Sequence, residues 1–353
     1  MTTATDAVPV RPALAAIPDL QATRLPDSAV YLDKNELPWP APPAVIRACA
    51  GDVHAYPPVA PTALADRVAR FHGVEPNRVA VGAGSATVLS QILHAVCAPD
   101  EEVVFAWPGF AAYPALVSAS GARPVPVPLR QHRHDLAVML DRVHSGPVRV
   151  VIVCNPHNPT GTLLGADELE HFLDRVPPSV LVVLDEAYQE FVTDPTAPDG
   201  LVFGAARRNV VTVRTFSKAY GLAALRAGYC VGNTRIASAV RRCAVPYAVT
   251  RAAQDAASTA LDVREDFIGL WEQVTHERDR MRSALGALDY ELPDSQGNFV
   301  WLELGTDATR FRDHCAQHKV IVHTLPGHGV RVSVGRPEHN DQLLAVARTF
   351  PDS

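Results

Sequence analysis

Seven short apolar runs recur along this chain before residue 232, and they limit what it can fold into. The runs are rich in β-branched residues and do not alternate between polar and apolar positions, which is typical of strands buried on both faces. They span residues 78–81, 102–106, 124–127, 148–154, 180–184, 210–213 and 228–231. Helical patterns lie between most of them, at 86–97, 110–120, 166–175 and 220–225. Strands that alternate with helices predict an α/β fold with a mainly parallel, seven-stranded sheet flanked by helices.

The character of the sequence changes after residue 235. Residues 236–289 are rich in Ala, Arg and Glu with few turn residues, which predicts long helices. Strands are expected next, and a helix closes the chain; these elements fall at 299–304, 320–322, 329–334 and 340–350. A smaller α+β domain therefore follows the α/β domain, as a chain of 353 residues allows. We divide the chain into an N-terminal segment, a large domain and a small domain, at 1–44, 45–240 and 241–353.

Composition excludes several classes of protein. Apolar residues make up 47% of the chain and charged residues 20%, as in ordinary globular proteins. The net charge is -6 and no basic cluster is present, so nucleic acid is not an expected partner. The uncharged stretch 103–122 is broken by Pro108, Gly109 and Pro114, which argues against a membrane span, and the first twenty residues do not resemble a secretory signal. The six cysteines form no CxxC pair, so we expect no metal site and a cytoplasmic location.

In open parallel sheets, ligands bind beyond the carboxyl ends of the strands, so the segment after each expected strand is a candidate for the site. Gly82-Ala83-Gly84-Ser85-Ala86-Thr87 comes after the first strand and leads into a helix. Free N–H groups at such a helix start can bind an anion. Thr87 stands where a dinucleotide-binding fingerprint needs a third glycine, so that class of site is not expected. The alternative is a turn with no ligand.

Two further strand ends carry polar side chains. The rigid loop Asn155-Pro156-His157-Asn158-Pro159-Thr160-Gly161 can present the Asn158 amide to a ligand, or its asparagines can simply hold the loop. Asp185, with Tyr188 close behind it, ends another strand. A buried carboxylate needs a cation or a hydrogen-bond donor; the alternative is that Asp185 caps a helix.

Lys218 follows the strand at 210–213, with Ser217 before it and Arg226 after it. Most lysines are solvated surface charges, but one between apolar segments is partly desolvated and becomes a nucleophilic amine. Pyridoxal 5'-phosphate (PLP) needs a lysine for its aldehyde, an acid near its ring nitrogen, donors to its phenolate oxygen and a phosphate clamp. The strand ends of this chain supply all four.

These motifs resemble those of fold-type I PLP-dependent aminotransferases, in the branch that contains histidinol-phosphate and aromatic (phenylalanine-type) aminotransferases. The resemblance runs from Tyr31 to the terminal helix. Its most specific segments are 155–161, 185–191, 214–226, 295–301 and 329–335. It implies a homodimer with shared active sites, with the N-terminal segment packing on the small domain and on the partner subunit.

The resemblance also assigns roles to residues. Lys218 matches the lysine that forms a Schiff base with PLP and shuttles the proton, and Asp185 matches the partner of the pyridine nitrogen. Tyr188, also expected at the catalytic centre, and Asn158 match donors to O3′. Phe110 matches the ring that stacks on the pyridine. The phosphate contacts and the substrate contacts are assigned in the same way: Ser85, Ala86, Ser217, Arg226 and the partner's Tyr56 for the phosphate, and Arg331, Asn35 and Asn298 for the substrate.

The chain departs from the family pattern at three places. The N-terminal PYxPG segment is missing, and Ile17-Pro18-Asp19-Leu20-Gln21-Ala22 stands there instead. Lys34 adds a charge where a small residue is common. His323 replaces a second arginine, which argues against a phosphate-bearing substrate such as histidinol phosphate and favours a plain amino acid. The alternative is that His323 is a substitution without functional meaning.

We therefore expect an aminotransferase that moves an amino group from an aromatic or histidinol-phosphate-like amino acid to a 2-oxo acid. Trp39, Trp107 and Phe110 make an aromatic substrate plausible, although these side chains could be structural. The same scaffold could instead support a decarboxylase, a replacement or cyclising enzyme, or an oxidase, because pocket geometry selects which Cα bond breaks. A catalytically silent binding protein is disfavoured by the joint presence of Lys218, Asp185 and Arg226.

Overall fold

A computed structural model describes residues 11, 14, 17, 28–51 and 53–350 of the chain. Its larger sheet has seven strands in the order β2-β8-β7-β6-β5-β3-β4, and β8 alone runs antiparallel to its neighbours. The expected α/β fold with a mainly parallel, seven-stranded sheet is therefore confirmed. The strands are β2 (Val79–Gly82), β3 (Glu102–Trp107), β4 (Arg123–Pro128), β5 (Val148–Cys154), β6 (Leu181–Asp185), β7 (Val210–Thr215) and β8 (Gly228–Val231).

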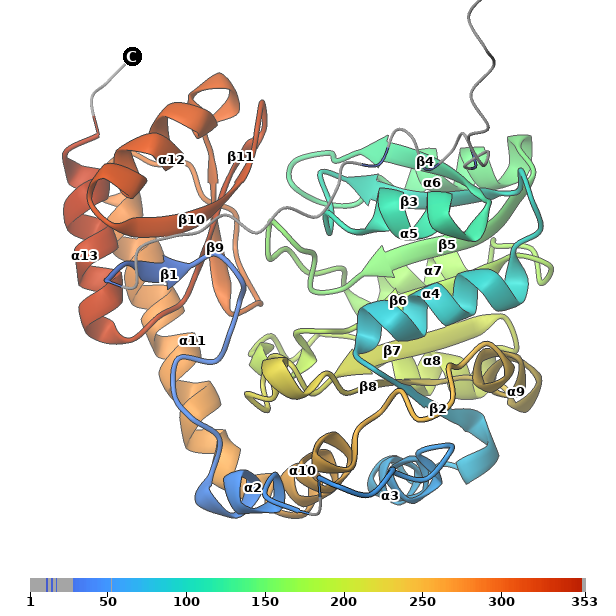
Figure 1. Ribbon diagram of the computed structural model, residues 1–353. Helices are drawn as coiled ribbons and strands as arrows, with labels where there is room; N and C mark the ends of the chain where they lie inside the picture. The colour runs from blue at the N-terminus through green and yellow to red at the C-terminus, as the bar shows by residue number, and fades with distance from the viewer. Residues whose placement is uncertain (1–10, 12–13, 15–16, 18–27, 52, 351–353) are drawn as a thin grey trace, which may run out of the picture.

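Both faces of this sheet are buried, as its unalternating strands predict. Successive strand residues enter different cores: Val103 joins one hydrophobic cluster and Val104 the other. The first cluster includes residues of α4 (Ser85–Val96), α5 (Tyr113–Ser120) and α9 (Thr234–Arg242). The second includes residues of α6 (Leu136–Ser145), α7 (Ala166–Leu173) and α8 (Gly200–Ala206). Figure 1 shows these helices on the two sides of the sheet.

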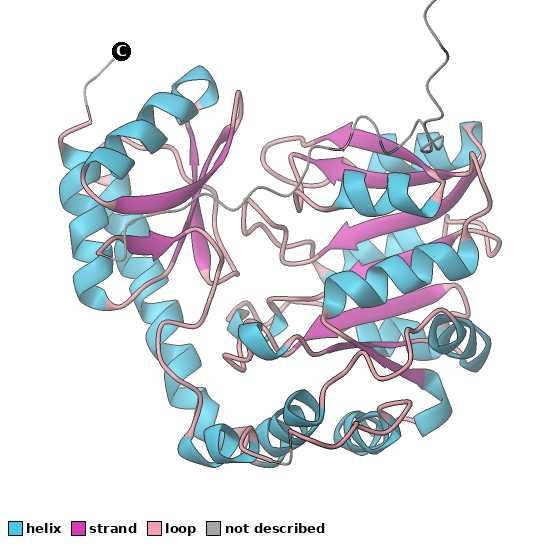
Figure 2. Ribbon diagram, in the orientation of Figure 1, coloured by secondary structure: helices cyan, strands magenta, loops and turns pink. Residues whose placement is uncertain are grey.

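A second, four-stranded sheet has the order β1-β10-β11-β9. Its strands are β1 (Val30–Leu32), β9 (Phe299–Glu303), β10 (Val320–Leu325) and β11 (Gly329–Ser333), and α11 (Glu265–Gly286), α12 (Ala308–Gln317) and α13 (Pro337–Arg348) pack beside them. Figure 2 shows the two groups of strands facing each other. Because β1 pairs in parallel with β10, the beginning of the chain crosses to the sheet built by its end. The domain limits at 44 and 240 stay a prediction.

The structure corrects part of the sequence analysis. The helix expected at 220–225 is only a short 3₁₀ turn, Ala223–Leu225, because Gly221 and Arg226 adopt left-handed conformations on either side of it. The region 236–289 divides into α9, α10 (Arg251–Asp262) and α11. Several elements were not foreseen: β1, α2 (Pro43–Ala48), α3 (Thr62–His72), α6, α8 and α12, with the 3₁₀ turns Pro76–Arg78, Gln189–Phe191 and Gly305–Asp307. Most of the atypical segment 17–22 lies outside the described residues.

In the part of the chain that the structure describes, no helix is long and apolar enough to span a bilayer. Within the same residues, no group of three His, Cys, Asp or Glu side chains is placed to hold a metal ion.

Candidate active site

A cavity of about 340 Å³ lies where the carboxyl ends of the strands of the large sheet meet the small sheet. The elements that line it lie far apart in sequence, and they bring together ten of the predicted site residues. These are Ser85, Ala86, Phe110, Asn158, Asp185, Tyr188, Ser217, Lys218, Arg226 and Arg331. Asp33, Lys34 and His323 line the same cavity.

One end of the cavity is built to receive an anion. Helix α4 starts at Ser85 with no side-chain cap, so its first N–H groups remain available. Arg226 bends over this helix start and donates a hydrogen bond of 3.2 Å from Nη1 to Ser217 Oγ. Glycine at 84 makes this approach possible, because a Cβ there would lie 2.5 Å from Arg226 Nη2. At Gly228, a Cβ would lie 2.4 Å from the Ser85 nitrogen. The two glycines leave room for a guanidinium beside a helix N-terminus, a favourable arrangement for phosphate.

Asp185 ends β6 and is buried, with 9% of its surface exposed. Its Oδ2 accepts a hydrogen bond of 2.7 Å from the Tyr113 hydroxyl. Its Oδ1 is also buried and has no hydrogen-bond partner among the described residues. Burial raises the pKa of this carboxyl, and the bond from Tyr113 opposes that rise. The capping alternative is wrong, because only a turn and the 3₁₀ segment at 189–191 follow Asp185.

Tyr188 lies beside Asp185 with its hydroxyl held by two amides. Asn158 Nδ2 donates to it at 3.2 Å and Asn35 Nδ2 at 3.0 Å. Burial raises the pKa of this phenol, so it stays protonated and can donate in turn. Asn155 has the purely structural role, since its side chain bonds both the N–H and the C=O of Leu164.

Lys218 is partly buried and lines the cavity between the anion-binding end and the small sheet. Its Nζ donates a hydrogen bond of 2.7 Å to the backbone carbonyl of Lys34. Burial, followed by the charge of Arg331, lowers the pKa of this amine to about 7. A lysine with this pKa is substantially neutral at physiological pH and can act as a nucleophile or a base. The surface-charge alternative does not fit this position.

Arg331 enters the cavity from β11, on the small sheet. Its Nη1 donates to Asn158 Oδ1 at 2.7 Å and its Nη2 to the Asp33 carbonyl. Its buried Nε has no partner among the described residues and remains available for a ligand. Asn298 does not line the cavity, but it donates a bond of 3.1 Å to the Asn35 carbonyl, and so holds the residue that bonds Tyr188.

Two departures from the family pattern, Lys34 and His323, line the cavity. His323 pairs with Arg331 across β10 and β11, and burial together with Arg331 lowers its pKa to about 4, so it is neutral near pH 7. Lys34 has its amine 5.7 Å from the centre of the Tyr31 ring. Tyr56 does not line this cavity; it is 82% exposed and contacts Tyr247.

Of the three aromatic residues considered for the substrate, only Phe110 lines the cavity. Trp39 and Trp107 pack against the hydrophobic clusters. Tyr113 was missed by the sequence analysis. It stands three residues after Phe110, and a tyrosine hydroxyl that is buried must bond something, but nothing in the sequence indicates that its partner is Asp185.

Comparison with known proteins agrees with this geometry. The family model "Aminotransferase class I and II" matches residues 28–346. The chain belongs to this family. The curated aromatic amino acid aminotransferase of Thermobifida fusca is 45% identical over 349 residues, covering 97% of each chain. The one from Streptomyces coelicolor is 44% identical over 326 residues, covering 91% of this chain and 90% of its own.

Solved structures support the same assignment. A histidinol-phosphate aminotransferase from Sinorhizobium meliloti, in complex with pyridoxal-5'-phosphate, superposes with a TM-score of 0.88 at 27% identity, covering 99% of this chain and 100% of its own. The expected fold-type I architecture and the expected aminotransferase function are thereby confirmed. Of the reactions considered from the sequence, amino transfer is the one that the family and its curated relatives support.

Proposed function

We propose that this aminotransferase uses PLP to transfer the amino group of an aromatic amino acid to a 2-oxo acid. The observation that carries the cofactor assignment is the placement of Lys218, with its lowered pKa, in one cavity with Asp185 and an anion-binding helix start. The aromatic substrate class rests on the relatives from Thermobifida fusca and Streptomyces coelicolor, which are aromatic amino acid aminotransferases.

The residues of the cavity fit PLP. The unpartnered Oδ1 of Asp185 is a buried acceptor that suits a protonated ring nitrogen. Ser85, Ala86, Ser217 and Arg226 would hold the phosphate, and Phe110 would cover the ring. When bound, PLP withdraws electrons from the substrate's Cα and so makes its proton removable.

Each polar side chain then has a definite task. Lys218, which would also hold the cofactor, takes the proton from the substrate Cα through its neutral amine. The hydroxyl of Tyr188 and the amide of Asn158, which bond each other, would be the donors to the cofactor's phenolate oxygen. Asp185 would supply the negative charge that keeps the cofactor's ring nitrogen protonated.

The substrate end favours a single carboxylate. Arg331 donates one bond each from Nη1 and Nη2 to the protein, which leaves N–H groups, including that of Nε, for a ligand carboxylate. The neighbouring His323 is neutral at pH 7 and adds no second positive charge for a phosphate dianion. These observations favour an amino acid carboxylate over the phosphate of histidinol phosphate.

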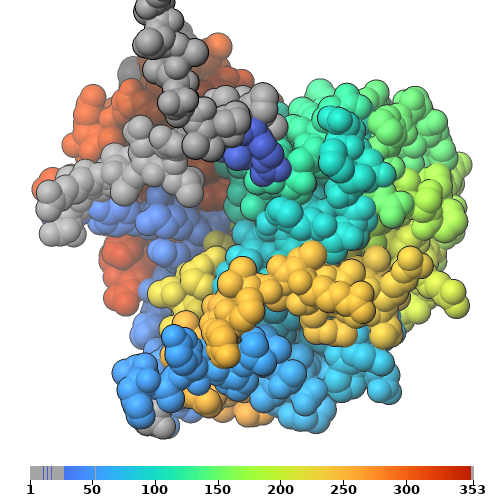
Figure 3. All heavy atoms as spheres, turned by 45° about the vertical axis from the view of Figure 1, so that its right-hand side comes forward, coloured from blue at the N-terminus to red at the C-terminus, as the bar shows by residue number. Residues whose placement is uncertain are grey.

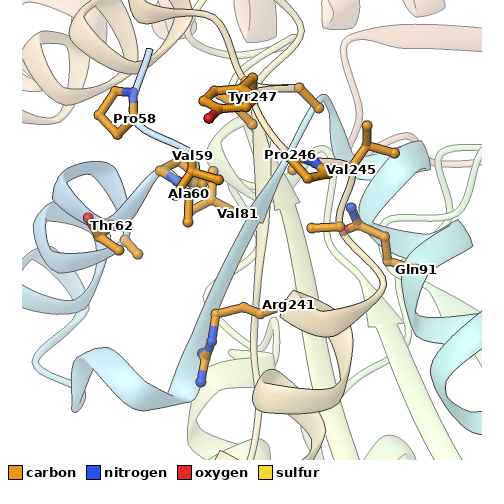
Figure 4. Close-up of a pocket in the computed structure, with 16 residues that line it drawn as sticks. Pro58, Val59, Ala60, Thr62, Val81, Gln91, Arg241, Val245, Pro246 and Tyr247 are labelled. Atoms are coloured by element: carbon orange, nitrogen blue, oxygen red, sulfur yellow. The ribbon is translucent and has the colours of Figure 1, made fainter. Parts of the chain in front are cut away.

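We further propose that two copies pair through the surface around Tyr56. Segments 58–62 and 244–249 enclose a hollow of about 230 Å³, which Figure 4 shows with Val59, Val245 and Tyr247 around it. Figure 3 shows the blue and gold segments lying beside each other on this face. Val53, Tyr56 and Val245 are 90%, 82% and 68% exposed, which is unusual for large apolar side chains. A second copy would cover them and carry its Tyr56 to this chain's phosphate site.

All six cysteines are free thiols, which supports a reducing cytoplasmic location.

A single-turnover experiment tests the substrate assignment. Enzyme loaded with PLP is mixed with phenylalanine, tyrosine, tryptophan or histidinol phosphate, and both the cofactor absorbance and the released product are followed. We expect stoichiometric release of the aromatic 2-oxo acid, reversed by adding a 2-oxo acid. Release of carbon dioxide or peroxide would contradict amino transfer, and faster turnover of histidinol phosphate would contradict the aromatic substrate class.

A further inference from the structure

Tyr113 reaches Asp185 from outside the cavity. It is the first residue of α5, it is 1% exposed, and it does not line the cavity itself. Its hydroxyl nevertheless donates a hydrogen bond of 2.7 Å to Asp185 Oδ2. The hydroxyl of Tyr113 can therefore act on a ligand in the cavity through the Asp185 carboxylate.

The position of this hydroxyl is set by packing. The Tyr113 ring lies with its centroid 5.6 Å from that of Phe105 and 5.3 Å from that of Phe110, the second contact edge-to-face at 90°. A tyrosine has only two side-chain torsions, and both are fixed when the ring is enclosed. Tyr113 is therefore a rigid donor.

The bond from Tyr113 makes the two oxygens of the Asp185 carboxylate different. Oδ2 is occupied by Tyr113, whereas Oδ1 has no hydrogen-bond partner among the described residues. The titratable groups that influence Asp185 are Tyr113, Cys154, Tyr188 and Lys218. Within this set only Tyr113 donates a hydrogen bond to the carboxylate, and a donor to a carboxylate stabilises its charged form.

We propose that Tyr113 is a positioning residue for the reaction: its hydroxyl holds Asp185 in the charged form and leaves Oδ1 for the cofactor's ring nitrogen. This rests on the proposed use of PLP. The buried carboxylate has little other support, since burial raises its pKa and the remaining contributions come from the Ala187 backbone and the charge of Lys218. Without the hydroxyl, Asp185 would bind protons more tightly and would offer a neutral acid to the ring nitrogen.

The test measures PLP affinity of the cofactor-free protein as a function of pH, through the change in protein fluorescence. Tyr113→Phe keeps the ring and removes only the hydroxyl. We expect it to weaken PLP binding roughly tenfold or more at neutral pH. The acidic limb of the affinity profile should move to higher pH by about one unit, because Asp185 becomes harder to ionise. A merely structural hydroxyl would lower the melting temperature without moving that limb.

Tyr229→Phe is the matched control. Tyr229 is 3% exposed and its hydroxyl bonds His72 Nε2 at 2.7 Å, so the variant removes a bond of the same length that does not involve Asp185. Its acidic limb should coincide with that of the wild type. In a second comparison, Tyr113→Phe added to Asp185→Asn should cause no further loss of affinity, because the hydroxyl acts through the carboxylate.

A near-isosteric replacement should shift the acidic limb of the PLP-affinity profile in the opposite direction. With 3-fluorotyrosine at position 113 the hydroxyl is a stronger donor, so the acidic limb should move to lower pH. An unchanged limb in both the fluorinated and the phenylalanine variants, or an equal loss of affinity on the Asp185→Asn background, would overturn the role of Tyr113. Failure of the wild-type protein to bind PLP would instead overturn the proposed function.

Discussion

Arg331 Nη1 donates a hydrogen bond of 2.7 Å to Asn158 Oδ1 and thereby joins the two sheets across the active site. Arg331 belongs to β11 of the small sheet, whereas Asn158 lies in the loop after β5 of the large sheet. Asn158 also bonds the Tyr188 hydroxyl. The arginine proposed for the substrate carboxylate is thus coupled directly to the group proposed for the cofactor's phenolate oxygen.

Replacing Arg331 by lysine should separate substrate binding from cofactor binding. Lysine keeps the positive charge but loses the planar fork and the free Nε donor. We expect kcat/KM for an aromatic amino acid to fall about 10- to 100-fold, the cost of one or more charge-assisted hydrogen bonds. PLP affinity should fall much less, by about threefold, because Arg331 reaches the proposed donors to the cofactor only indirectly, through Asn158. A large loss of PLP affinity with an unchanged KM would contradict the assignment of Arg331 to the substrate.

The pKa of Lys218 predicts how cofactor attachment depends on pH. Because the free amine has a pKa of about 7, the rate of PLP attachment to the cofactor-free protein should rise roughly tenfold per pH unit below that value and level off above it. Stopped-flow absorbance between pH 5 and 9 measures this. Arg331→Gln should move the midpoint to higher pH, since it removes a positive charge that opposes protonation of Lys218. A midpoint near the ordinary lysine value of 10.5 would contradict the desolvated site.

Glu186 supports the strand ends beneath the site. Its Oε2 accepts bonds of 2.9 and 2.7 Å from Nε and Nη2 of the buried Arg214. Glu186→Ala leaves that guanidinium short of a partner and should lower the free energy of unfolding by about 3–5 kcal/mol. Glu168→Ala, which breaks an exposed pair with Arg133, should cost only about 0–1 kcal/mol. Urea unfolding measures both variants, and equal midpoints would show that the buried pair contributes no more to stability than the exposed pair.

Shared active sites can be detected by mixing two inactive proteins. In a mixed dimer of Lys218→Ala and Tyr56→Ala subunits, one site carries both defects, whereas the other has Lys218 from one subunit and Tyr56 from its partner. After unfolding and refolding of an equal mixture, we expect activity to recover to about one quarter of the wild-type value, because half of the dimers are mixed and each has one intact site. No recovery, or a monomer by light scattering, would rule out the shared site.

The cofactor half of the site could be predicted from the sequence, because it is built from strand ends. Lys218, Asp185 and Asn158 each follow an apolar run, and parallel strands bring their carboxyl ends to one edge of the sheet. The same reasoning could not supply Tyr113, whose partner depends on how α5 packs on the sheet. It also gave a helix at 220–225, where the chain instead turns through Gly221 and Arg226 to bring the guanidinium over α4. The packing of Trp39 and Trp107 likewise depends on tertiary contacts that their own neighbours in sequence do not specify.

The central claim is that Lys218 holds PLP, and the chain allows a direct test because it contains only three lysines, Lys34, Lys218 and Lys319. The loaded protein is reduced with borohydride, digested with trypsin and analysed by mass spectrometry. We expect the added mass on the peptide that contains Lys218, its loss in Lys218→Ala and its retention in Lys34→Met. Because Lys34 lines the same cavity, added mass on Lys34 in the wild-type protein would contradict the account.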